Sequence, residues 1–306
     1  MAERIRARRL LTEQGWLTHQ VLTHEGGVIT AIDPIPADDS VREVELLVPA
    51  LIDGHVHGGA GVDVMDEAAD ALARLSLAKA AEGVGAFLAT TVTAPLPAIL
   101  STLGRIADAM ASPLPGAQLL GSYLEGPYFT PDNKGAHDPA LFRELDLAEL
   151  DQLQQVARGT LKVVALAPEK TGALAAIRHL KQIGIRVMLG HSAADHDTTM
   201  AALTAGASGL VHCFNGMRGL HHREPGMVGA GLVHPDAWLE LIADGHHVHP
   251  SVLRLCHCCA RDRLLLITDA MRAAGMPDGH YLLGDYRVEM KDGVVRTNTG
   301  GLAGST

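Results

Sequence analysis

The feature of this chain that most constrains its fold is a repeated alternation of apolar, strand-length runs with helical stretches from residue 46 onward. Strand and helix alternating eight times is the pattern of a parallel barrel with helices around it. The sequence therefore predicts an α/β fold, a (β/α)8 or TIM barrel. The eight runs are 46–52, 86–92, 118–124, 161–166, 185–189, 209–211, 238–243 and 264–267, and helical periodicity marks 68–81, 99–110, 147–156, 173–183, 198–205 and 252–261.

The two ends of the chain depart from this pattern. Residues 1–45 read as short strands and turns, so we expect a small β-rich domain there and the barrel domain over residues 46–306. Residues 281–290 and 294–296 flank Asp292-Gly293, which predicts a hairpin. The glycine-rich segment 300–304 leads to Ser305 and Thr306, where a helix would begin. We therefore expect a barrel truncated at its C-terminus and a small domain without its C-terminal part.

Composition narrows the class of protein. Aromatic residues make up only 3% of the chain, so the core must be aliphatic. A net charge of −10 without any basic run argues against nucleic-acid binding. No apolar stretch is long enough to span a membrane, and the N-terminus lacks an apolar signal core, which predicts a cytoplasmic protein. Three of the four cysteines lie within residues 256–259, which predicts free thiols rather than a disulfide framework.

Histidines and carboxylates gather where the apolar runs end. In a (β/α)8 barrel the active site is assembled from residues at the carboxyl ends of the strands, so these side chains should converge. Alternate residues of a strand face the same side, which lets both imidazoles of His55-Val56-His57 face one ion. Imidazole and carboxylate ligands suit zinc or another first-row divalent metal. A single such histidine would be read as structural, but six strand-end residues together predict a metal centre: His55, His57, Glu125, His191, His212 and Asp269.

Short motifs around these residues carry a family resemblance. PALIDGHVHG covers residues 49–58, KGAH covers 134–137 and HHREPG covers 221–226, with LEGPYF, LAPE, GHS, HCFNGM, IADGHHVH, TDA and GLAGS in the expected order between and after them. The chain resembles the amidohydrolase superfamily and, within it, the N-acetylglucosamine-6-phosphate deacetylases. The resemblance implies hydrolysis of the acetamide of N-acetylglucosamine 6-phosphate to glucosamine 6-phosphate and acetate.

The resemblance also implies roles for individual residues. Glu125, His191 and His212 would hold the main ion, and His55 and His57 would hold a second ion where one is present, so one or two zinc ions are expected. Asp269 would act as general base and then general acid. His137 would polarise the acetamide carbonyl or orient the sugar.

Substrate contacts follow from the same resemblance. Arg223 is the first candidate to bind the phosphate and His247 the second, because guanidinium grips phosphate with two hydrogen bonds. In the family this arginine comes across a dimer interface, which implies a homodimer. The other expected substrate contacts are Ala136, His137, Asn215, Gly216, Leu302, Ala303 and Gly304.

Three alternatives stay open at this point. The substrate can be N-acetylgalactosamine 6-phosphate, since epimer choice depends on the shape of the pocket, or another N-acyl compound. From a different class, the chain can be a barrel scaffold that has lost catalysis. A scaffold should purify without stoichiometric metal, so metal content separates it from an enzyme.

Overall fold

The computed structural model describes residues 2–35 and 43–306. It divides into two compact units, Met1–Leu51 and Ile52–Thr306. The division into domains 1–45 and 46–306 stays a prediction, and residues 1 and 36–42 of the first domain lie outside the described residues.

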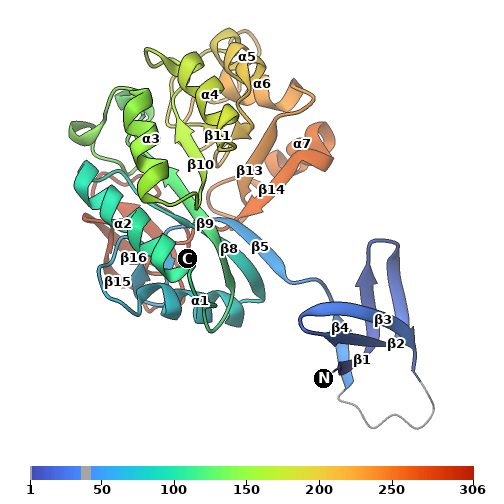
Figure 1. The fold of residues 1–306 in the computed structure, drawn as a ribbon. Helices are drawn as coiled ribbons and strands as arrows, with labels where there is room; N and C mark the ends of the chain where they lie inside the picture. Colours follow the sequence, from blue (N-terminus) through green and yellow to red (C-terminus); the bar gives the residue numbers. More distant parts are fainter. Residues whose placement is uncertain (1, 36–42) are drawn as a thin grey trace. The chain divides into compact units, whose positions relative to one another are not determined.

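The N-terminal unit is a four-stranded sheet in the order β3-β2-β1-β4 (Figure 1). Its strands are β1 Glu3–Thr12, β2 Gly15–Glu25, β3 Val28–Pro34 and β4 Glu43–Leu47. Gly26 and Gly27 both have positive φ and form the turn between β2 and β3. The sheet buries Ala7, Leu10 and Leu22 as a small core of its own.

One predicted barrel strand proves to be parts of two strands. Residues 46 and 47 of the run 46–52 belong to β4, where Leu46 pairs with Arg9 of β1. The first barrel strand is β5 Leu51–Val56. Pro49 lies between them and separates them, because proline lacks the N–H that a strand ladder needs.

Eight strands form the barrel, in the order β14-β13-β12-β11-β10-β9-β8-β5. After β5 they are β8 Val84–Thr90, β9 Gln118–Glu125, β10 Leu161–Leu166, β11 Arg186–Leu189, β12 Gly209–Leu210, β13 Trp238–Ile242 and β14 Leu264–Ile267. The ring nearly closes beyond β14, where a bridge joins Val56 to Ala270 and the Asp269 amide donates to the His55 carbonyl at 3.0 Å. The predicted (β/α)8 barrel is confirmed.

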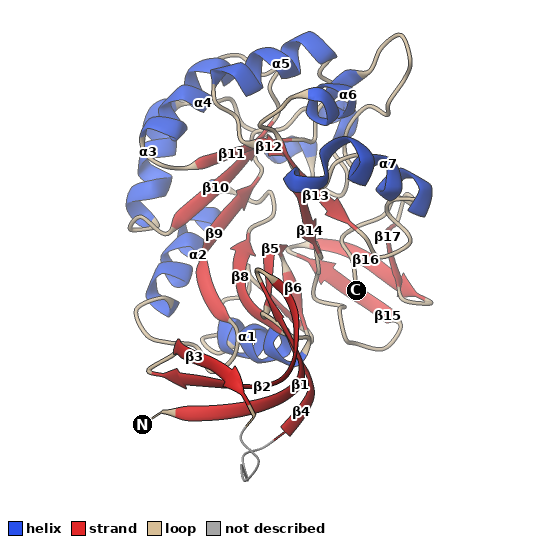
Figure 2. Cartoon of the chain, turned by 90° about the vertical axis from the view of Figure 1, so that its right-hand side faces the viewer, coloured by secondary structure: helices blue, strands red, loops and turns tan. Residues whose placement is uncertain are grey.

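Helices cover the outer side of these strands (Figure 2). They are α1 Ala71–Ala81, α2 Leu96–Ala109, α3 Leu147–Val156, α4 Ala173–Gln182, α5 His196–Ala205, α6 Gly226–Val233 and α7 Pro250–Ala260, with short 3-10 turns at Pro131–Asn133, Pro139–Leu141 and Arg261–Arg263. Helix α2 shows the physical logic, because Ile99, Leu103 and Ile106 recur at helical spacing and are fully buried. In α3, the Asp146 side chain accepts from the Ala148 amide and caps the first turn.

Helix α6 was not predicted. Every residue except Val233 is buried, so its sequence has no polar face and no helical period to detect. It packs so closely on the barrel that a Cβ on Gly231 would lie 2.6 Å from the Leu210 side chain. The glycines that make it a poor helix former locally are therefore required by its packing.

Antiparallel strands follow the barrel. They are β15 Gly279–Leu283, β16 Tyr286–Lys291 and β17 Val294–Thr297. A separate pair of short strands, β6 Gly58–Gly59 and β7 Val62–Asp63, lies in the loop after β5. The Asp292-Gly293 turn is confirmed, but reading residues 281–290 as one strand was wrong. The chain turns at Gly284, where φ is +53°.

The barrel and its helices enclose the main core. Two leucines of α3, one buried and one exposed, test how much this core contributes to the free energy of unfolding. Leu153 is fully buried and Leu147 is 41% exposed. We expect Leu153→Ala to lower the free energy of unfolding by about 2–5 kcal/mol, because it leaves a cavity. Leu147→Ala should cost far less. Urea unfolding of both variants measures the difference, and equal losses would contradict this placement of the core.

Two sequence predictions concern membranes and cysteines. Among the helices of the described residues, none combines the length and apolar character needed to cross a bilayer. The four cysteines are free thiols, with Cys213 and Cys256 buried and Cys258 and Cys259 exposed.

Candidate active site

All but two of the predicted site residues, His55 and Arg223, line a cavity of about 340 Å³ at the carboxyl ends of the barrel strands. His57 directly follows β5 and Glu125 ends β9. His191, His212 and Asp269 each lie two residues after the end of β11, β12 and β14. His191, His212 and Asp269 have positive φ values of 45°, 25° and 52°. Residues other than glycine rarely adopt such φ values, because they strain the backbone. Strain of this kind is often found at functional sites.

Glu125, His191 and His212 form the first group able to hold a metal ion. Glu125 Oε1 lies 3.3 Å from His191 Nε2 and 2.9 Å from His212 Nε2. The two Nε2 atoms are 3.1 Å apart. All three side chains are buried, so their donor atoms face one another with little competition from solvent.

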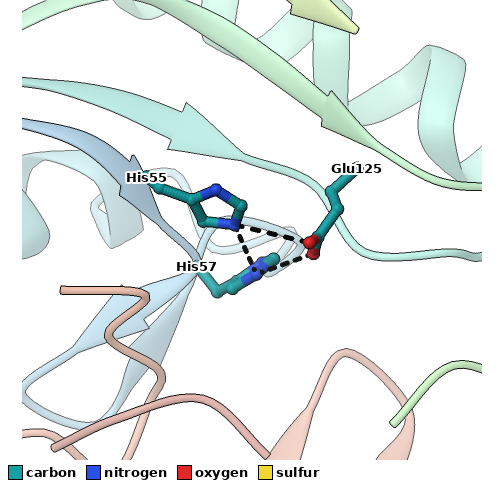
Figure 3. Close-up of side chains that lie close together, drawn as sticks. All are labelled: His55, His57 and Glu125. Atoms are coloured by element: carbon teal, nitrogen blue, oxygen red, sulfur yellow. Dashed lines mark hydrogen bonds and ion pairs between the residues drawn. The ribbon is translucent and has the colours of Figure 1, made fainter. Parts of the chain in front are cut away.

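His55, His57 and Glu125 form the second group, drawn in Figure 3. The Nε2 atoms of the two imidazoles are 3.3 Å apart, and Glu125 Oε2 lies 3.0 Å from His57 Nε2. Glu125 belongs to both groups: its Oε1 faces His191, His212 and, at 3.6 Å, His55, while its Oε2 faces His57. A carboxylate in this position can bridge two ions.

The outer nitrogens of the imidazoles test whether these residues fit a metal. His191 Nδ1 lies 3.2 Å from the Asn133 carbonyl, and His212 Nδ1 lies 3.0 Å from the Asn215 carbonyl. A carbonyl can only accept, so each Nδ1 carries the proton and each Nε2 keeps a lone pair directed inward. This is the arrangement of metal-ligating histidines, and the donor set fits a divalent ion.

Charges in the site are strongly coupled. Burial opposes the charged form of Glu125, yet the facing imidazoles, His55 foremost, hold the pKa of Glu125 well below its ordinary value. Burial would likewise lower the pKa of His57, but the Asp269 and Glu125 carboxylates raise it to about 9. Burial and the neighbouring His137 ring lower the pKa of His191 to about 4. The buried carboxylates of Glu125 and Asp269 are thus stabilised by positive charge nearby. A divalent cation can supply that charge in place of protons on the imidazoles.

Asp269 sits beside the second group. Its Oδ1 lies 3.2 Å from His57 Nε2 and 3.5 Å from His55 Nε2. Its backbone is fixed from both sides, because its amide donates to the His55 carbonyl and its carbonyl accepts from the Ser305 amide at 2.8 Å. The carboxylate is therefore held against the His55 and His57 imidazoles, at the edge of the cavity.

His137 is a buried cavity residue rather than a surface loop residue. Its Nδ1 accepts from the Thr93 amide at 3.4 Å, and its Nε2 lies 3.6 Å from Glu125 Oε2. Because Nδ1 accepts, Nε2 carries the proton and can donate into the cavity. The other predicted substrate contacts that line the same cavity are Ala136, Asn215, Gly216, His247, Leu302, Ala303 and Gly304.

Arg223 lies elsewhere in its own chain. It is exposed and lines a separate hollow with Asp195, Asp197 and Arg218. The cavity of the same chain is not lined by Arg223. A phosphate contact from this arginine thus requires a second copy of the chain, and it stays a prediction.

Sequence reasoning missed two buried carboxylates under the site. Asp53 accepts from the Thr268 amide at 3.1 Å and from its hydroxyl at 2.5 Å, tying β5 to the end of β14. Glu240 Oε2 lies 3.3 Å from His55 Nδ1. The available signal for Glu240 was a charged residue in the middle of the apolar run 238–243.

Comparison with known proteins identifies the family. A family model described as the amidohydrolase family matches residues 46–279. The chain belongs to the amidohydrolase family. Among related amidohydrolases, an N-acetylgalactosamine-6-phosphate deacetylase of Escherichia coli O157:H7 is 67% identical over 306 residues, covering 100% of this chain and 81% of that protein. An N-acetylglucosamine-6-phosphate deacetylase of Vibrio furnissii is 54% identical, covering 98% of this chain and 77% of that protein.

Solved structures agree with the assignment of this chain to the amidohydrolase family. A mutant N-acetyl-D-glucosamine-6-phosphate deacetylase from Mycobacterium smegmatis, in complex with N-acetyl-D-glucosamine-6-phosphate, superposes with a TM-score of 0.94. Its sequence is 33% identical, and the match covers 99% of this chain and 80% of that chain. The resemblance seen in the sequence motifs is confirmed.

Proposed function

We propose that this amidohydrolase is an N-acetylglucosamine-6-phosphate deacetylase, which hydrolyses the acetamide of its substrate to glucosamine 6-phosphate and acetate. The observation that carries the proposal is that Glu125, His57, His191, His212 and Asp269 line one cavity at the strand ends, with His55 completing the second metal group. The named relatives act on amino-sugar phosphates according to their names, which supports the substrate class. A scaffold without catalysis would have no need for this buried, charged set.

We assign the metal ligands from the two groups. Glu125, His191 and His212 would hold the main ion, and His55 and His57 with Glu125 would hold a second. Zinc is the proposed metal, because buried imidazole and carboxylate donors suit it. When bound, such an ion supplies Lewis acidity, lowering the pKa of water and polarising a carbonyl.

The chain's own residues would move the protons. Asp269 accepts a proton from the water that attacks the acetamide carbonyl carbon, and its low pKa keeps it ready to do so at neutral pH. His137 donates from Nε2 to the carbonyl oxygen, stabilising the charge that develops there. Asp269 then delivers the proton to the departing nitrogen as the C–N bond breaks, so that acetate and the free amine leave.

Phosphate recognition is the basis for a proposed homodimer. His247 lines the cavity, and its Nδ1 is fixed by Asp244 at 2.7 Å. Arg223 would reach the cavity of a second copy and grip the phosphate there. We propose that the homodimer acts in the cytoplasm.

Removing Arg223 tests the phosphate contact. We expect Arg223→Ala to raise KM for N-acetylglucosamine 6-phosphate by about tenfold or more, since hydrogen bonds to charged groups contribute about 1.5–3 kcal/mol. KM for unphosphorylated N-acetylglucosamine should change little. Steady-state kinetics of both substrates measure this, with Arg254→Ala, an exposed arginine of α7, as control. Equal changes for both substrates would remove Arg223 from the phosphate site.

Mixing two damaged chains tests the homodimer. The Arg223→Ala chain lacks the phosphate contact, and the Asp269→Asn chain lacks the general base. In a mixed dimer, the site of the Arg223→Ala chain has its own Asp269 and receives Arg223 from the other chain, so one site is complete. We expect activity to rise when the two are unfolded and refolded together. Activity equal to the sum of the separate variants would contradict a site shared between subunits.

N-acetylgalactosamine 6-phosphate is the second candidate substrate. It is favoured by one observation, the 67% identity to a deacetylase named for that epimer against 54% for the glucosamine enzyme. Measuring kcat/KM on both epimers decides between them. A higher value for the galactosamine compound would replace the first proposal while leaving the reaction unchanged.

A further inference from the structure

Glu240 is a buried carboxylate that the proposed chemistry does not use. It lies in the middle of β13, between Leu239 and Leu241, and is 4% exposed. Burying a carboxylate inside a barrel is strongly unfavourable unless its oxygens are hydrogen-bonded. Its partners therefore show what holds it there.

Those partners belong to both metal groups. Glu240 Oε2 lies 3.3 Å from His55 Nδ1, and it also accepts from the His212 amide at 3.4 Å. The Glu240 backbone carbonyl accepts from the Cys213 amide at 2.7 Å. One residue of β13 thus contacts the His55 ring and the loop that carries His212.

His55 differs from the other oriented imidazoles of the site. Backbone carbonyls fix the outer nitrogens of His191 and His212, but the partner of His55 Nδ1 is a side chain. The Tyr123 ring packs on His55 with centroids 4.6 Å apart, which limits the tilt of the ring but supplies no acceptor for Nδ1. Within residues 2–35 and 43–306, Glu240 is the acceptor that selects the His55 tautomer with the proton on Nδ1 and a lone pair on Nε2.

We propose that Glu240 is a positioning residue that holds His55 in its ligating tautomer and orientation through the Nδ1–H···Oε2 contact. Glu240 does not itself face the reacting atoms. Its role is to direct the His55 lone pair toward His57 and Glu125. This inference rests on the proposed metal-dependent function.

Zinc binding to the purified, metal-free protein tests the role without substrate. Affinity is measured by competition with a chromophoric chelator, and stoichiometry by elemental analysis, for Glu240→Leu, Glu240→Gln and the reference variant His55→Asn. We expect Glu240→Leu to weaken, by about 10–100-fold, the same zinc site that His55→Asn removes. Zinc held by Glu125, His191 and His212 should be retained.

The glutamine variant and a neighbouring residue separate positioning from general damage. Glu240→Gln keeps an oxygen that can accept from Nδ1 and should lose less affinity than Glu240→Leu. Where the leucine variant does not fold, glutamine carries the test with an expected loss of about threefold or more, because charge-assisted hydrogen bonds are roughly twice as strong as neutral ones. Leu241→Ala removes a buried side chain of the same strand and should lower stability without changing zinc affinity.

Several outcomes would overturn the role of Glu240. Unchanged zinc affinity in Glu240→Leu would do so, as would equal loss at both sites, which indicates a structural role. No effect of His55→Asn on zinc would also overturn it. A wild-type protein that binds zinc at both groups but releases no acetate would instead refute the proposed function and leave the positioning role standing.

Discussion

Replacing Asp269 with asparagine is expected to lower kcat by about 10²–10⁴-fold, the usual contribution of a general acid–base group. The amide keeps the shape of the side chain but cannot accept the proton of water or deliver it to the leaving amine. Metal binding should persist, because Asp269 is not a member of either metal group. Acetate release and zinc content of the variant measure the two effects separately.

A control for this substitution lies at the other end of the same strand. Asp262 is exposed and precedes β14, whereas Asp269 follows it. Asp262→Asn should keep full activity. Turnover of Asp269→Asn within about threefold of wild type would sink its assignment as the general base, since that role predicts a far larger loss.

Glu125→Gln is expected to damage both metal groups at once. Glu125 belongs to each group and is buried among five imidazoles, those of the four ligand histidines and of His137, so neutralising it removes the charge that they and the ions face. Changes beyond the ligands typically cost 10–100-fold in metal affinity, so the loss of this shared ligand should exceed about 100-fold. Activity should fall in parallel and return only in part with excess zinc.

Glu149 offers a matched control for Glu125. It is also a buried glutamate, but its partners are Arg143 and the Tyr128 hydroxyl, which lies 2.8 Å away. Glu149→Gln should lower thermal stability and leave zinc affinity unchanged. Zinc affinity that survives Glu125→Gln but falls in Glu149→Gln would contradict the assignment of the ligands.

Much of the barrel was predictable because its strands are short apolar runs between helices. The runs at 161–166 and 264–267 match β10 and β14 to the residue. Parallel strands place their carboxyl ends at one edge, so the meeting of Glu125, His191 and His212 followed from their positions at the ends of the third, fifth and sixth runs. The order of strands and helices along the chain was therefore enough to predict that these three side chains meet, without knowledge of their contacts.

The errors have local physical causes. Proline at position 49 divides an apolar run that pattern alone joins, and Gly284 turns a chain that alternates on both sides of it. Helix α6 is apolar all round and shows no period. Of the three, only α6 depends on partners distant in sequence, because it packs on the side chains of Leu210 and Leu239.

Site residues beyond the ligands were harder to predict for a different reason. Glu240 contacts His55 across 185 residues, and its strand looks like an ordinary buried strand. Arg223 lies outside the cavity of its own chain, so its proposed role needs a second copy. Neither relation can be derived from the order of residues along one chain.

Acetate release from N-acetylglucosamine 6-phosphate by the purified protein, with added zinc and after chelation, is the most direct measurement of the proposed reaction. We predict release with zinc, loss of release on chelation, and recovery when zinc is returned. A protein that carries zinc at the Glu125 site yet releases no acetate from either epimer would contradict the proposed function.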